Sequence, residues 1–276
     1  MVLALGDLTN APTMFADDTT MVTTNVNAGE LNAIYFDALD YNGSPTRVYA
    51  YVGLPAGASS NSPVPGVVLV HGGGGTAFDE WVELWTNRGY AAISIAVEGQ
   101  TDSTLPPTMN TGWHIHNMPG PVRDGIYGDS DEALTNQWMY HAVADTVLAN
   151  SLLRSLPEVD AGQVGLMGIS WGGVITSTTI GIDDRFRFAV PTYGCGSLAS
   201  AENQYGTALG DNDLYKEVWD PMVRITNITM PALWFSWPGD QHFPMDSLAD
   251  CYTNMPGPYM VSLVPGMGHG HPPAWN

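Results

Sequence analysis

Residues 168–173 read Gly168-Ile169-Ser170-Trp171-Gly172-Gly173. They follow a mostly apolar run, 163–167, that predicts a buried strand, and they open a stretch, 171–182, that predicts a helix. A serine in a sharp turn between strand and helix needs glycine two positions before it and two positions after it, because side chains there would collide. Such a turn raises the hydroxyl of Ser170 above the edge of a sheet. The stretch therefore predicts a reactive serine, and the alternative is an ordinary glycine-rich turn.

Strands and helices alternate around this turn. The expected buried strands are 66–70, 90–97, 163–167, 186–191, 232–237 and 259–264, and the expected helices are 78–88, 131–156, 171–182 and 244–254. This alternation is typical of a mostly parallel central sheet with helices on both faces. Two earlier strands, 31–41 and 46–54, flank Asn42-Gly43, a dipeptide that favours a tight turn. We therefore expect an α/β fold that begins with an antiparallel N-terminal hairpin.

The chain is expected to form one domain. It has 276 residues, 44% of them hydrophobic, and no change in composition marks a second unit. Residues 1–30 are polar and lack a steady periodicity, which predicts an arm in front of a domain that spans 31–276. Two irregular stretches, 98–131 and 194–229, are too long for ordinary connections and predict functional loop insertions.

The composition is strongly acidic. Eight Lys and Arg stand against 28 Asp and Glu, which gives a net charge of -20 at pH 7. A phosphate backbone or an anionic membrane surface would repel such a chain. No stretch reaches the roughly eighteen consecutive apolar residues of a membrane span. We therefore expect no nucleic-acid partner and no membrane insertion, and the composition suits a cytosolic chain as well as a secreted one.

No metal site is expected, and free thiols are favoured over a disulfide. Cys195 and Cys251 form no Cys-x-x-Cys pair, so two buried thiols are favoured over a single bridge and over a structural zinc site. His114 and His116 lie in the loop 98–131, where no cluster of carboxylates or cysteines would complete a metal site. A loop that faces substrate is the favoured interpretation of these two histidines.

A serine hydroxyl becomes a nucleophile when a base takes its proton and a third group orients that base. Asp240 follows the expected strand 232–237, and His269 follows the last expected strand, so both reach the edge of the sheet where Ser170 lies. The order serine, acid, base along the chain is that of a hydrolase. Two alternative acids on the next helix are Asp246 and Asp250.

From Leu31 onward the chain resembles an α/β-hydrolase. It resembles most the esterase branch that includes dienelactone hydrolases, acetyl xylan esterases and the catalytic domains of prolyl oligopeptidases. The resemblance implies that Ser170 is the nucleophile, Asp240 the acid and His269 the general base. His269 is chosen because this branch tends to end in Gly-His-Gly-Phe, which puts His271 in the place of an aromatic residue. Dienelactone hydrolases have cysteine as nucleophile, so a serine favours ester turnover.

The loop His71-Gly72-Gly73-Gly74-Gly75 directly follows the expected strand 66–70. Without side chains, its backbone N–H groups can approach a developing oxyanion, and the resemblance implies that one of them acts together with the N–H of Trp171. Gly73 and Gly74 are both candidate donors. The alternative is a turn that serves packing alone, but four glycines carry an entropic cost that packing rarely justifies.

Aromatic residues gather in the expected loops near this site, among them Tyr193. Most should belong to the core, and one or two can form a platform for an acyl group or a sugar. The candidates for substrate binding are Trp113, His114, His116 and Trp237.

Together these patterns predict a serine carboxylic-ester hydrolase that forms an acyl-enzyme on short-chain, neutral esters and needs no metal or organic cofactor. Acetylated carbohydrate is one candidate substrate class. A peptidase of the prolyl oligopeptidase type is the first alternative, disfavoured because the chain has no room for the usual extra domain. A non-catalytic binding member of the fold is the second, disfavoured because the nucleophile, the base and the glycine loop are all present.

Overall fold

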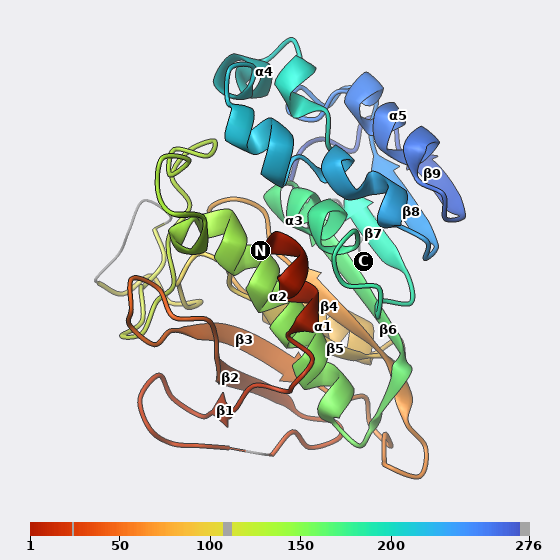
Figure 1. The fold of residues 1–276 in the computed structure, drawn as a ribbon. Helices are drawn as coiled ribbons and strands as arrows, with labels where there is room; N and C mark the ends of the chain where they lie inside the picture. Colours follow the sequence, from red (N-terminus) through yellow and green to blue (C-terminus); the bar gives the residue numbers. More distant parts are fainter. Residues whose placement is uncertain (24, 107–111, 271–276) are drawn as a thin grey trace.

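The computed structural model describes residues 1–23, 25–106 and 112–270. Its strands form one sheet in the order β1-β2-β3-β5-β4-β6-β7-β8-β9 (Figure 1). The first pairings, from β1 to β3 and from β3 to β5, are antiparallel, and all pairings from β5 through β4 to β9 are parallel. In Figure 1, α2 and α3 lie in front of the sheet and α1 lies behind it. The expected α/β architecture with an antiparallel start is confirmed.

The strands are β1 (Met14–Phe15), β2 (Leu31–Asp37), β3 (Arg47–Gly53), β4 (Val64–Val70), β5 (Ala91–Ile95), β6 (Val159–Ile169), β7 (Ala189–Thr192), β8 (Ala232–Ser236) and β9 (Tyr259–Leu263). The α-helices are α1 (Asp79–Thr86), α2 (Trp138–Ser155), α3 (Trp171–Thr179), α4 (Gln204–Leu209) and α5 (Met245–Asn254). Shorter helical turns are Val2–Asp7, Leu134–Asn136, Leu198–Ser200, Tyr215–Trp219 and Pro221–Asn227.

The core lies on both faces of the central strands. Residues 67–70 of β4 and 91–95 of β5 are completely inaccessible to solvent, as expected of apolar runs without polar alternation. At the sheet's end, β9 differs: Tyr259, Met260, Val261 and Leu263 are exposed. β9 is the last strand of the sheet in the described part of the chain.

The hairpin turn between β2 and β3 forms as the sequence predicts. Asn42 and Gly43 have φ of 50° and 75°, and the backbones of Tyr41 and Ser44 bond to each other in both directions, at 2.9 and 3.0 Å. Positive φ at both central residues is the requirement that Asn-Gly satisfies at the lowest steric cost. The N-terminal residues 2–7 pack against α2, and Ser151 of that helix donates to the carbonyl of Leu8 at 2.6 Å.

The longest helix starts later than its pattern predicts. The expectation was 131–156, but α2 begins at Trp138, whose backbone N–H donates to Asp129 Oδ2 at 2.6 Å. This side chain satisfies one of the free N–H groups at the helix start, and residues 131–137 form turns instead. The stretch 194–229 also contains more helix than expected. Asn203 caps α4 by accepting from Tyr205 N, and Asp220 accepts from Met222 N at the start of the last helical turn.

Both cysteines are buried free thiols, as the sequence predicts. In the described ranges, none of the helices combines the length and the apolar character needed to cross a bilayer.

One buried carboxyl in α2 generates a prediction about stability. Burial raises the pKa of Asp145 well above its usual value, and its Oδ1 has no hydrogen-bond partner among the described residues. The folded state therefore holds a proton that the unfolded state releases, so this group destabilises the fold increasingly as the pH rises above about 4. We expect Asp145→Asn to raise the free energy of unfolding at about pH 8 by about 1–3 kcal/mol, and by much less at about pH 4.

Urea denaturation at both pH values measures this effect. The control is Asp131→Asn, because Asp131 is exposed. This substitution should leave the free energy of unfolding unchanged at both pH values. An Asp145→Asn protein that is less stable than the wild type at the higher pH would contradict the prediction.

Candidate active site

Ser170 lies alone in the turn between β6 and α3. Its φ of 57° and ψ of -119° belong to a region that L-residues rarely adopt. The flanking glycines show why the turn exists only with this sequence. A Cβ at Gly168 would lie 2.1 Å from the carbonyl oxygen of Gly172, and a Cβ at Gly172 would lie 2.2 Å from that of Val70. The strained serine is held in place by its own N–H, which donates to Thr192 O at 3.0 Å.

The structure brings Ser170, His269 and Asp240 together. His269 Nε2 lies 3.0 Å from Ser170 Oγ, and His269 Nδ1 lies 2.9 Å from Asp240 Oδ2. The Asp240 side chain is completely buried, whereas that of His269 is 26% exposed. Three residues far apart in the sequence thus form one hydrogen-bonded relay at the carboxyl edge of β6, β8 and β9.

Asp240 is held as a carboxylate by its hydrogen bonds. Burial alone would raise its pKa, but the bond from His269 and the backbone N–H groups of Phe243 and His242 outweigh burial, and the pKa lies below its usual value. These N–H groups donate to Oδ1 at 3.0 and 2.8 Å, and the indole of Trp237 donates to Oδ2 at 3.1 Å. A charged Asp240 accepts from Nδ1–H of His269, which leaves Nε2 free to accept from the serine hydroxyl.

Aromatic rings enclose His269. The ring of Tyr193 has its centre 4.5 Å from the imidazole, His242 lies at 4.6 Å, and Phe243 stacks at 5.8 Å with an angle of 17°. The hydroxyl of Tyr193 donates to Gly270 O and accepts from Gly270 N at 3.3 Å. The sequence predicts Tyr193 as a core or platform residue, whereas in the structure it fixes the segment carrying His269. Only the fold reveals this contact.

The glycine loop, residues 72–75, lies against the serine turn. A Cβ at Gly72 would come within 3.1 Å of Ser170 Cβ, and a Cβ at Gly73 within 2.5 Å of Trp171 Cδ1. The N–H of Gly74 donates to Glu98 Oε1 at 3.2 Å. Of the two expected oxyanion donors, Gly74 therefore already has a partner, which leaves Gly73 as the candidate.

A cavity of about 310 Å³ opens above the relay. Its lining consists of Gly72, Gly73, Gly74, Gly75, Phe78, Trp113, Ile169, Ser170, Tyr193, His269 and Gly270. The sequence candidate Trp113 is part of this lining, and its indole donates to Gly74 O at 3.0 Å.

The other three substrate-binding candidates lie outside the lining. His116 is buried against Tyr35, with ring centres 5.2 Å apart, and His114 Nδ1 lies 3.1 Å from Leu105 O. In an extended segment, alternate side chains point to opposite sides, so a chain that turns Trp113 into the cavity turns both histidines away from it. The indole of Trp237 donates to Asp240 Oδ2 and does not line the cavity.

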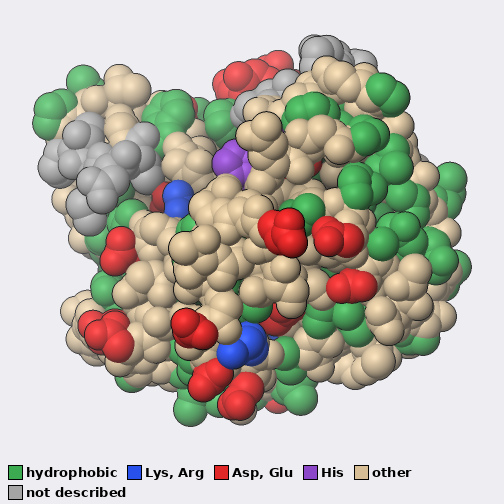
Figure 2. Space-filling model, turned by 90° about the horizontal axis from the view of Figure 1, so that it is seen from above, with side chains coloured by type: hydrophobic (Ala, Val, Ile, Leu, Met, Phe, Trp, Pro, Cys, Tyr) green, Lys and Arg blue, Asp and Glu red, His purple; other side chains and the backbone are tan. Residues whose placement is uncertain are grey.

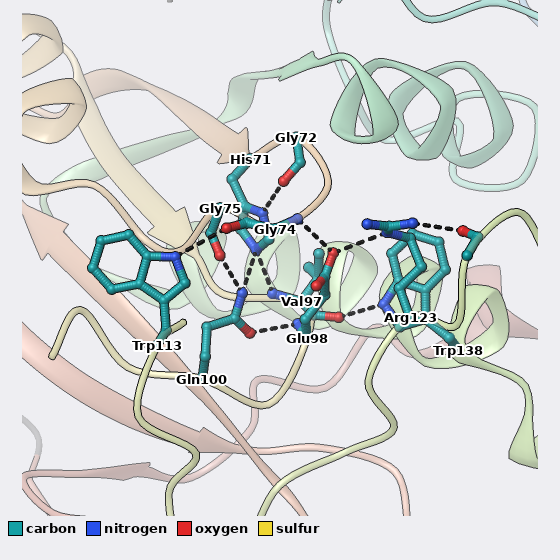
Figure 3. A network of polar contacts seen from close by, with 11 residues as sticks. His71, Gly72, Gly74, Gly75, Val97, Glu98, Gln100, Trp113, Arg123 and Trp138 are labelled. Carbon is teal, nitrogen blue, oxygen red and sulfur yellow. Dashed lines mark hydrogen bonds and ion pairs between the residues drawn. The ribbon is translucent and has the colours of Figure 1, made fainter. Parts of the chain in front are cut away.

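A buried polar network lies beneath the glycine loop (Figure 3). His71 Nε2 accepts from Val97 N at 3.0 Å, so Nδ1 carries the proton and donates to Gly72 O at 2.6 Å. Burial lowers the pKa of His71, which keeps the ring neutral. Sequence reasoning treated His71 only as the start of the loop and missed Glu98, Gln100 and Arg123. The available signal was the presence of polar residues directly after a buried strand.

Among the described residues, no group of three or more His, Cys, Asp or Glu side chains is arranged to hold a metal ion. His271, the second histidine of the C-terminal segment, lies outside the described residues.

The sequence profile of the family described as acetyl xylan esterase (AXE1) matches residues 16–229, most of the chain and all of its serine turn. The chain belongs to the acetyl xylan esterase family. It therefore belongs to a family of hydrolases with the α/β-hydrolase fold.

Solved structures of low sequence identity share this fold. The acetyl xylan esterase from Paenibacillus sp. R4 superimposes with a TM-score of 0.72 at 18% identity, over 99% of this chain and 88% of that one. Acetyl xylan esterase 1 from Thermoanaerobacterium sp. JW/SL YS485 gives 0.70 at 18% identity, with the same coverage. A curated relative, dipeptidyl aminopeptidase BIII of Pseudoxanthomonas mexicana, is 26% identical over 255 residues. This match covers 80% of the present chain and 33% of the relative's length.

The close packing of the serine turn predicts a large effect of one added methyl group. Gly172→Ala forces a Cβ against the backbone oxygens of Val70 and His71, so we expect it to destabilise the fold by at least about 2 kcal/mol and to abolish activity. The control is Gly120→Ala, because a Cβ there meets no described atom within 4 Å and should cost less than about 0.5 kcal/mol. Thermal unfolding of the two variants checks this, and equal melting temperatures would refute it.

Proposed function

We propose that the protein is a serine carboxylesterase that removes short acyl groups, acetyl above all, from neutral alcohols. The observation that carries the proposal is the continuous relay from Asp240 through His269 to Ser170 Oγ, with contacts of 2.9 and 3.0 Å. Membership of the acetyl xylan esterase family supports an ester as substrate.

The relay supports an acyl-enzyme mechanism. Ser170 Oγ attacks the ester carbonyl while His269 Nε2 takes its proton, and the charged Asp240 stabilises the imidazolium that forms. The N–H groups of Gly73 and Trp171 hold the oxyanion of the tetrahedral intermediate. His269 then gives its proton to the departing alcohol. A water molecule activated by the same imidazole attacks the acyl-enzyme, releases the acid and restores the serine.

The cavity favours a small acyl group. Its volume is about 310 Å³, and Phe78, Trp113 and Tyr193 contribute aromatic surface to its walls. Part of that volume must also hold the alcohol next to His269. An acetyl group fits beside these rings, whereas each added methylene has to compete with the alcohol for space.

Charge favours neutral substrates. Acidic side chains are spread over the face in Figure 2, and basic ones are few. With a net charge of -20, the surface potential lowers the local concentration of anionic esters.

A peptidase is the second candidate, since a curated relative is a dipeptidyl aminopeptidase and the same relay can cleave amides. Because this chain spans only 33% of that relative's length, the likeness does not carry the relative's activity over. A binding protein without activity is disfavoured, because none of the three relay side chains is replaced.

The nucleophile is tested by removing one oxygen. We expect Ser170→Ala to lower hydrolysis of p-nitrophenyl acetate by at least about 10⁴-fold without changing the melting temperature, because the fold does not use this hydroxyl. The control Ser155→Ala alters an exposed serine at the far end of α2 and should retain full activity. A fluorophosphonate probe should label the wild type and the control but not Ser170→Ala. Wild-type turnover by Ser170→Ala would remove the assignment.

Substrate class is tested with a series of acyl lengths. We expect kcat/KM to fall from p-nitrophenyl acetate to butyrate to octanoate, because the cavity is small. Acetate release from acetylated xylan should exceed cleavage of dipeptidyl p-nitroanilides. A maximum at octanoate would contradict the cavity argument, and faster cleavage of the anilides would favour the peptidase.

A further inference from the structure

The glycine loop, residues 72–75, is held by side chains from a distant segment (Figure 3). Glu98 Oε1 accepts from Gly74 N at 3.2 Å, the indole of Trp113 donates to Gly74 O at 3.0 Å, and Gln100 Nε2 donates to Gly75 O at 2.5 Å. A run of four glycines has little conformational preference of its own. The positions of its N–H groups are therefore imposed by these contacts.

One of the contacts has an electrostatic cost. The side chain of Glu98 is only 1% exposed, and its carboxylate bonds to the N–H of Gly74, the residue after the candidate oxyanion donor Gly73. Negative charge would develop nearby in the transition state, and two like charges in a poorly solvated site repel each other strongly. An unpaired Glu98 would thus destabilise the transition state, although it holds the loop that supplies the oxyanion donor.

Arg123 supplies the compensating charge. Its Nε lies 3.2 Å from Glu98 Oε1, and its Nη1 donates to Gly125 O at 2.5 Å. The guanidinium lies over the indole of Trp171, 5.4 Å from the ring centre, and a Cβ at Gly73 would come within 2.7 Å of Arg123 Nη2. The cation therefore contacts both residues whose N–H groups are the candidate oxyanion donors.

We propose that Glu98 and Arg123 act as a pair of positioning residues for the oxyanion loop. Glu98 fixes the peptide between Gly73 and Gly74, and Arg123 neutralises Glu98 and packs the loop against Trp171. Neither residue is part of the cavity lining. The inference rests on the proposed esterase function and adds to it the residues that set the geometry of the oxyanion donors.

A double-mutant cycle tests the pair on p-nitrophenyl acetate. We expect Arg123→Ala to lower kcat by about 10²-fold, with KM within about threefold of the wild type, because the loss falls on transition-state stabilisation. The double variant Glu98→Gln/Arg123→Ala keeps an acceptor for Gly74 N–H and removes both charges. It should recover at least about tenfold of the lost kcat, because the uncompensated carboxylate is gone.

Two comparisons separate positioning from general stability. Arg185 forms a second ion pair, in which its Nη2 lies 2.7 Å from Asp183 Oδ2. The side chains of Arg185 and Asp183 are 16% and 1% exposed. These fractions match the 20% and 1% of the Arg123 and Glu98 side chains. Arg185 lies beyond the C-terminal end of α3, away from the loop, so Arg185→Ala should lower the melting temperature but leave kcat within about twofold. Glu98→Gln should exceed Glu98→Ala in kcat by at least about tenfold, since only glutamine retains the acceptor.

The outcomes are distinguishable. If wild-type protein and Ser170→Ala are equally inactive on esters, the proposed function fails. If the wild type is active and Ser170→Ala is not, the pair is refuted by an unchanged kcat in Arg123→Ala or by a double variant no faster than Arg123→Ala. Should Arg123→Ala fail to fold, the Glu98→Gln and Glu98→Ala pair decides alone, and equal kcat values for the two overturn the proposal.

Discussion

The whole site depends on how closely the backbone of the serine turn approaches the strands beside it. Gly172 lies against the carbonyl of Val70 at the end of β4, and Gly173 lies against that of Thr192 at the end of β7, where an added Cβ would come within 2.6 Å. Because no side chains intervene, α3 starts directly at the edge of the sheet. Ser170 then stands above that edge, where it contacts the glycine loop after β4 and His269 after β9. His269 in turn contacts Asp240, which follows β8.

The sequence predicted what local patterns determine. Apolar runs gave β4, β5 and the parallel core, the glycines around Ser170 gave the turn, and the chain order pointed to Asp240 and His269. It missed what depends on distant contacts: the start of α2 at Trp138, set by Asp129, and the direction of His114 and His116. Glu98 and Arg123 are 25 positions apart in the sequence, and no periodicity connects them.

The protein has few cationic side chains, so the position of each one matters for the charges of the site. Only eight Lys and Arg stand against 28 Asp and Glu, and one of the eight, Arg123, pairs with Glu98 beneath the glycine loop. Asp240 stays charged through hydrogen bonds from backbone and indole N–H groups and the imidazole of His269. His71 stays neutral because it is buried. Dipoles thus surround the carboxylate of Asp240, whereas a guanidinium pairs with that of Glu98.

The exposed apolar residues of β9 have a consequence for how the molecules behave in concentrated solution. An edge strand with free N–H and C=O groups and apolar side chains is a template for pairing with another chain. A net charge of -20 opposes the approach of two copies, but at about 1 M salt the screening length falls to about 3 Å. High ionic strength therefore weakens the Coulomb repulsion that opposes pairing of two β9 strands, and low ionic strength preserves it.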